Sequence, residues 1–212
     1  MATKYLEQWD SLLIKFSVSQ TAAAKSFADI VLYYGESGRY YHNLAHIEQV
    51  LSVIGELKHL ANNYPAIQFA AWFHDIIYNT HTPDNEVQSA VHAEAILTTL
   101  TIPAATIRKV SQLILATAKH LNPTDDADTA ILLDADLAIF GSKTADYNRY
   151  AQAIRKEYSH VPDGDYHAGR IRILNRFLER PQIYRTPLLF DRLEDKAREN
   201  LADEIEQLKN AK

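Results

Sequence analysis

Gln68-Phe-Ala-Ala-Trp-Phe-His74-Asp75-Ile-Ile-Tyr78 is an apolar run interrupted by a histidine and an aspartate. A run of this kind belongs in a hydrophobic core, where an ionised aspartate is costly unless it is paired or binds a metal. Adjacent residues on a helix point about 100° apart, so both side chains reach one ion only if it lies between their directions. The pair is therefore either part of a metal site or a His–Asp pair on a partly exposed face.

The sequence on both sides of this stretch has helical periodicity. Apolar residues recur at three- and four-residue steps, as they do from Ile47 to Leu57 and from Val87 to Leu97. Sustained alternation of apolar and polar residues is missing, so we predict no significant sheet. Turn residues such as those of Gly35–Gly38 separate the helices, and no repeat or low-complexity linker divides the chain. The sequence predicts an all-α fold, with a single all-helical domain over residues 1–212.

Composition excludes several classes of protein. The chain of 212 residues has no cysteine, which rules out disulfides, zinc ribbons, cysteine-ligated iron–sulfur clusters and thiol nucleophiles. The formal net charge of -5 and the lack of a basic stripe argue against a nucleic-acid partner. The N-terminus lacks the apolar core of a signal peptide, and no apolar stretch approaches the roughly 20 residues that span a bilayer. We expect a cytoplasmic protein with no membrane partner.

Two other pairs of polar residues lie in helical segments. His42 and His46 are four residues apart, so they share one face of a helix if that helix begins early enough. Asp134 and Asp136 interrupt the apolar segment 130–140, and because they are two residues apart they point to different faces. We expect one of these acids to bind a metal and the other to cap a helix or to support a ligand.

Taken in chain order, these residues resemble the H…HD…D signature of the HD superfamily of metal-dependent phosphohydrolases. His46 precedes an aliphatic residue by four, as in the first helix of that family, and an apolar run precedes His74-Asp75. A bacterial subfamily of predicted HD phosphohydrolases resembles nearly the whole chain. It does so in residues 41–43, 84–90, 133–137, 154–158, 183–184 and 198–201. The resemblance implies an HD-domain helical bundle with additional C-terminal helices and a divalent-metal site.

The resemblance also implies which residues bind the metal. They are His46, His74, Asp75 and one acid of the pair Asp134 and Asp136. Asp134 is favoured because it follows the apolar Ile-Leu-Leu run, as the family ligand does. Asp136 stays an alternative because many HD proteins have alanine before the ligand. Imidazole and carboxylate ligands with open positions suit Mn, Fe, Co, Ni, Zn or Mg, and the sequence does not choose among them.

Five residues are candidates for catalysis and substrate binding. Glu86 follows a turn and is either a general base or a ligand-orienting carboxylate, or simply an acid that favours a helix N-terminus. His42 is either an acid for the leaving group, a residue that supports a ligand, or a solvated histidine. Tyr41, Arg155 and Tyr158 are candidates to line a substrate pocket, although Arg155 could equally pair with neighbours on a helix surface.

Three functions follow from these residues. The first is hydrolysis of a phosphomonoester or phosphodiester, a nucleotide or related small molecule, by a water that the metal activates. The second is a di-iron oxidoreductase with an HD fold, which requires His92 and His120 as ligands of a second metal. These two histidines lie where some HD proteins hold a second metal; alternatively, His92 is a surface residue and His120 interacts with a helix C-terminus. The third is a non-catalytic module that binds a metal or a nucleotide.

Overall fold

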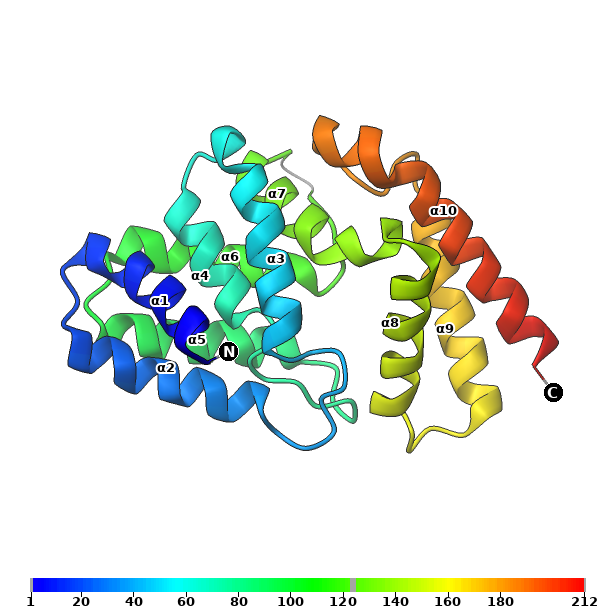
Figure 1. Ribbon diagram of the computed structural model, residues 1–212, viewed down its shortest axis with the longest axis horizontal. Coiled ribbons are helices and arrows are strands. Elements are labelled where there is room, and N and C mark those ends of the chain that lie inside the picture. The colour runs from blue at the N-terminus through cyan, green and yellow to red at the C-terminus, as the bar shows by residue number, and fades with distance from the viewer. Residues whose placement is uncertain (1, 123–124, 212) are drawn as a thin grey trace. The chain divides into compact units, whose positions relative to one another are not determined.

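A computed structural model describes residues 2–122 and 125–211 of the chain (Figure 1). These residues form helices and no strand, which confirms the predicted all-α fold. The chain is divided into two compact units, Met1–Leu133 and Asp134–Lys212, and the boundary lies inside a continuous helix. The single domain over residues 1–212 therefore stays a prediction.

Three helices of the first unit begin at side-chain caps. Ser19, Asn43 and Asn63 each accept a hydrogen bond from a backbone N–H in the first turn of the helix that follows. The helices are α1 (Ala2–Leu13), α2 (Gln20–Tyr34), α3 (Leu44–Glu56), α4 (Tyr64–Phe73), α5 (Asn85–Thr99), α6 (Ala104–Thr117) and the start of α7 (Ala127–Asp136), with short 3-10 helices η1 (Ile14–Phe16) and η2 (Lys58–Leu60).

The core of the first unit is built around α4, which is buried over most of its surface. This helix is apolar all round, as its sequence predicts, and it packs against α3, α5 and α6. Trp9 of α1 is fully buried and meets Phe69, Trp72 and Phe73 edge-on, at centroid distances of 5.8, 5.7 and 5.8 Å. Its indole N–H donates to the hydroxyl of Ser26 over 3.0 Å, so the one polar atom of this ring is satisfied.

The second unit contains η3 (Leu137–Gly141), α8 (Thr144–Glu157), α9 (Asp163–Leu178) and α10 (Pro187–Asn210), with α10 packed on η3 and α9. Its core holds buried polar groups. Arg170 donates to the carboxylate of Glu204 over 2.8 Å, and the hydroxyl of Tyr147 donates to the same carboxylate over 2.5 Å. Most arginines of the chain lie after residue 148, and Arg170 shows that at least one of them forms an internal ion pair.

In the part of the chain that the structure describes, no helix is both long enough and apolar enough to cross a bilayer.

Candidate metal centre

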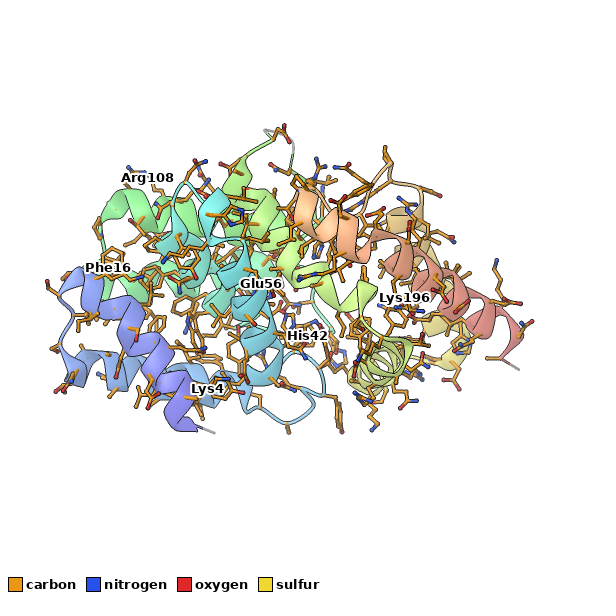
Figure 2. All side chains as sticks on the ribbon, turned by 45° about the horizontal axis from the view of Figure 1, so that its top comes forward. Lys4, Phe16, His42, Glu56, Arg108 and Lys196 are labelled. Carbon is orange, nitrogen blue, oxygen red and sulfur yellow. The ribbon has the colours of Figure 1, made fainter. Side chains whose placement is uncertain are left out.

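His46 reaches the centre from the first turn of α3. The side chain of Asn43 accepts the N–H of Ala45 over 2.9 Å, which makes α3 begin at Leu44. His46 is buried, with 3% of its surface exposed. His42 precedes this helix start, so the two histidines do not share a helix face as the spacing suggested. Figure 2 shows His42 near the N-terminal end of α3.

His74 and Asp75 lie where α4 ends. The helix ends at Phe73, and the N–H of His74 still donates to the carbonyl of Ala70 over 2.8 Å. His74 therefore keeps a helical conformation, while Asp75 belongs to the turn that follows. Because the chain leaves the helix between them, the two side chains are not held 100° apart and both face His46.

The three side chains converge with one atom each. The Nε2 atoms of His46 and His74 are 3.2 Å apart, and Oδ2 of Asp75 lies 3.0 Å from Nε2 of His74 and 3.6 Å from Nε2 of His46. Two donors that are each about 2.1 Å from a common ion are separated by roughly 3.0–4.2 Å at bond angles between about 90° and 180°. All three distances fall in this range, so these atoms fit one ion.

The backbone of α4 fixes the protonation of His74. Its Nδ1 lies 3.0 Å from the carbonyl oxygen of Ala71, which only accepts hydrogen bonds. We therefore assign a ring proton to Nδ1, so that Nε2, which faces His46 and Asp75, is the nitrogen that would bind an ion. An imidazole ligand needs this tautomer, and a carbonyl partner for its other nitrogen is the usual way to set it.

Asp75 is the charged member of the cluster. Desolvation alone would raise the pKa of its carboxyl group, but the neighbouring His74 and His42 and hydrogen bonds from His46 and His74 lower it by more. The net effect holds this pKa well below its usual value, so the group is an anion at neutral pH. Nε2 of His42 lies 4.0 Å from Oδ2 of Asp75.

Asp136 is the fourth member of the cluster. Helix α7 belongs to the first unit up to Leu133, where the carboxylate of Asp128 accepts the backbone N–H groups of Asn62 and Asn63 at the start of α4. Asp136 is the last residue of this same helix. One ligand atom from each of His46, His74, Asp75 and Asp136 lies within 4.8 Å of the others. This group could hold a metal ion.

Asp134, which the sequence favoured as the ligand, is not in this group. Its carboxylate accepts the backbone N–H of Arg185 over 2.9 Å, and the N–H and hydroxyl of Thr186 over 2.6 and 2.7 Å. Burial raises the pKa of Asp134, and these hydrogen bonds offset only part of that rise. The two acids of α7 do point to different faces, and among the described residues the group that could hold a metal ion contains Asp136 instead of the favoured Asp134.

Aromatic side chains surround the histidines. The ring of Tyr41 lies 4.8 Å from the ring of His46, so this predicted substrate-binding residue is next to the centre. The ring of His42 stacks on Tyr78 at a centroid distance of 4.1 Å. Tyr78 closes the apolar stretch after His74-Asp75, yet it was not among the predicted site residues, because a tyrosine after such a run gives no signal of its own.

The residues predicted for a second metal do not join the cluster. His92 lies on α5 with its ring 4.7 Å from that of Tyr33, and its Nε2 is buried without a hydrogen-bond partner among the described residues. Burial lowers the pKa of His92. His120 follows α6 in a left-handed conformation, with φ of 49°. Within residues 2–122 and 125–211, the candidate metal group contains neither histidine, so the second-metal prediction is not supported.

Glu86 lies in the first turn of α5, where an acid favours the helix N-terminus, and it is outside the cluster.

Arg155 and Tyr158, the predicted pocket residues of the second unit, contact each other. Arg155 donates to the carbonyl oxygens of Tyr158 and Val161 over 2.7 and 3.1 Å and to the carboxylate of Asp163 over 2.6 Å. Its guanidinium thus holds the turn between α8 and α9, and the substrate roles of Arg155 and Tyr158 stay predictions.

One residue beside the centre was missed entirely. Arg39, one of two arginines in the first two-thirds of the chain, donates to the backbone carbonyl of Asp75 over 2.6 Å. Its isolation from the other arginines was the only signal in the sequence that could have singled it out.

Comparisons of the chain with protein-family models, with curated proteins and with solved structures find no match. Function must therefore be inferred from the geometry of the site, and the likeness to the HD superfamily stays an expectation.

Proposed function

We propose that this chain is a metal-dependent phosphohydrolase of the HD type, which acts on a phosphomonoester or phosphodiester of a nucleotide or related small molecule. One observation carries the proposal: Nε2 of His46, Nε2 of His74 and Oδ2 of Asp75 meet at distances that suit a single ion, with Asp136 as the fourth member. The order of these residues along the chain is the order that the HD signature requires.

The donor set suits a divalent ion. Two neutral imidazoles and two carboxylates offset the charge of such an ion and are compatible with Mn, Fe, Co, Ni, Zn or Mg. A bound ion would supply a Lewis acid for a phosphoryl oxygen and would lower the pKa of a water molecule.

His42 is the residue best placed to move a proton. It lies outside the group of four, its ring is held by the stack on Tyr78, and Nε2 faces Asp75 at 4.0 Å. In its protonated form it would donate to the leaving oxygen of a substrate bound beside the centre. We assign no step to Glu86, because no contact among the described residues ties it to this cluster.

Metal content is the first test. Elemental analysis of the purified protein should find about one divalent transition metal per chain after loading with Mn, Co, Ni or Zn. His74→Ala and His46→Gln should lose it, whereas His59→Ala, which changes an exposed histidine on η2, should keep it. Circular dichroism shows whether each variant keeps its helices. A folded wild-type chain that retains no metal after loading would contradict the proposal.

The second test is hydrolysis. The loaded protein is assayed with nucleoside monophosphates, a simple aryl phosphate and an aryl phosphodiester, with the release of phosphate or phenol as the readout. Activity should need the metal, fall by at least about a hundredfold in His46→Gln, and stay unchanged in His59→Ala. Equal activity in wild type and in a folded His46→Gln would show that the hydrolysis comes from elsewhere.

A further inference from the structure

Arg39 connects the two segments that bring ligands to the proposed centre. It lies in the loop between α2 and α3, and only 3% of its side chain is exposed. Its guanidinium donates to the carbonyl oxygen of Asp75 over 2.6 Å, to that of Ile76 over 2.7 Å and to that of His42 over 3.3 Å. One side chain therefore ties the turn after α4 to the segment that leads into α3.

The other contacts of Arg39 hold the guanidinium itself in place. The carboxylate of Glu36 accepts from Nε over 3.3 Å and from Nη2 over 3.2 Å, which compensates the buried charge. The guanidinium also lies 5.2 Å from the ring centre of Tyr34 and 5.7 Å from that of Tyr78. Tyr78 in turn stacks on His42, so this network reaches the proposed proton donor.

The turn that Arg39 binds is the part of the site that helix geometry does not fix. Helix α4 ends at Phe73, and the carbonyls of Asp75 and Ile76 lie beyond its regular hydrogen-bonding pattern. A backbone carbonyl in such a place still needs a donor. Arg39 supplies it, and the direction of the Asp75 carboxylate depends on the backbone that Arg39 holds.

We propose that Arg39 is a positioning residue of the metal centre, whose guanidinium sets the placement of Asp75 and His42 relative to His46 and His74. The inference rests on the proposed metal centre. A lysine could not replace Arg39, because an ammonium group is a single point with three donors. The guanidinium is a planar fork that serves three carbonyls and a carboxylate at once.

Cobalt loading of Arg39→Lys tests this proposal. The matched control is Arg198→Lys, because Arg198 likewise donates to a carboxylate and to backbone carbonyls, those of Leu178, Arg180 and Pro181, within the second unit. The affinity for Co²⁺ is measured by titration, and the geometry around Co²⁺ by its visible absorption spectrum. Arg39→Lys should bind Co²⁺ about tenfold or more weakly and change the spectrum, and Arg198→Lys should do neither.

A second variant keeps the test decisive if Arg39→Lys does not fold. Glu36→Gln leaves the guanidinium in place but weakens its hold, and the side chain of Glu36 is half exposed, so the fold should tolerate the change. This variant should show the same change in the spectrum with a smaller loss of affinity. Wild-type affinity and spectrum in Arg39→Lys, or in Glu36→Gln where the lysine variant is unfolded, would overturn the role of Arg39 alone. A wild-type chain that binds no Co²⁺ would overturn the metal centre as well.

Discussion

The carboxylate of Asp134 accepts two hydrogen bonds from Thr186, one from the backbone N–H over 2.6 Å and one from the hydroxyl over 2.7 Å. The carboxylate of Glu194 accepts the N–H groups of Ile183 and Tyr184 in the same way. Two buried acids thus hold the segment 183–186 that leads into α10. Asp136, two residues after Asp134 on α7, is instead a member of the group that could hold a metal ion.

The same substitution should therefore affect metal affinity at Asp136 and the free energy of unfolding at Asp134. Asp136→Asn should lower metal affinity at least about tenfold and change the free energy of unfolding of the metal-free protein by less than about 0.5 kcal/mol. Asp134→Asn should lower that free energy by about 1–3 kcal/mol, because its amide NH₂ would face N–H groups that need an acceptor. Metal titration and urea unfolding of both variants measure the two effects.

The serine variant Thr186→Ser serves as a control, since it keeps the hydroxyl and the N–H that Asp134 accepts. It should bind metal like the wild type and lose little stability. If Asp134→Asn abolished metal binding while Asp136→Asn left it intact, the assignment of the ligand would revert to Asp134.

Periodicity and local motifs predicted much of this molecule. The all-α fold follows from apolar residues at helical spacing, and the His46, His74 and Asp75 cluster follows from polar residues set in apolar surroundings. The choice between Asp134 and Asp136 could not follow, because the partners of Asp134 lie more than 50 positions away at Arg185 and Thr186. Long-range partners of a buried acid leave no trace in its local sequence.

The same limit explains two other outcomes. The pair His42 and His46 has helical spacing, but the cap at Asn43 starts the helix between them. The network of Arg39 depends on where the turn after Phe73 comes to lie, which spacing along the chain does not encode. Local pattern therefore found the residues of the candidate metal group and missed Arg39, which donates to the backbone beside them.

Buried tyrosines predict an alkaline limit to the stability of the second unit. Burial raises the pKa of Tyr147, Tyr150 and Tyr184 above the usual 10, and raises the pKa of Tyr166 to about 12. A raised pKa means that the folded state favours the neutral phenol. The stability from these groups is therefore complete below pH 10 and is lost as the pH rises through their folded-state pKa values.

We expect a late phase of tyrosine ionisation that coincides with a loss of helix. Ultraviolet absorbance follows tyrosinate and circular dichroism follows helicity in the same titration. Tyr166→Phe should move the helix loss to higher pH, and Tyr40→Phe, which changes an exposed tyrosine, should leave it in place. Ionisation of all tyrosines near pH 10 with the helices intact would contradict the prediction.

Two glycines of the second unit should respond to alanine in opposite directions. A Cβ on Gly141 would lie 2.5 Å from Cβ of Leu193 and 2.7 Å from its carbonyl oxygen, so the backbone of η3 would have to move away from α10. We expect Gly141→Ala to lower the free energy of unfolding by about 1–3 kcal/mol. A Cβ on Gly169, inside α9, meets nothing within 4 Å. Gly169→Ala should therefore raise the same quantity by about 0.5–1 kcal/mol through better helix propensity. Urea unfolding measures the free energy of unfolding of both variants. Equal stability of the two would mean that η3 and α10 are not in the close contact described.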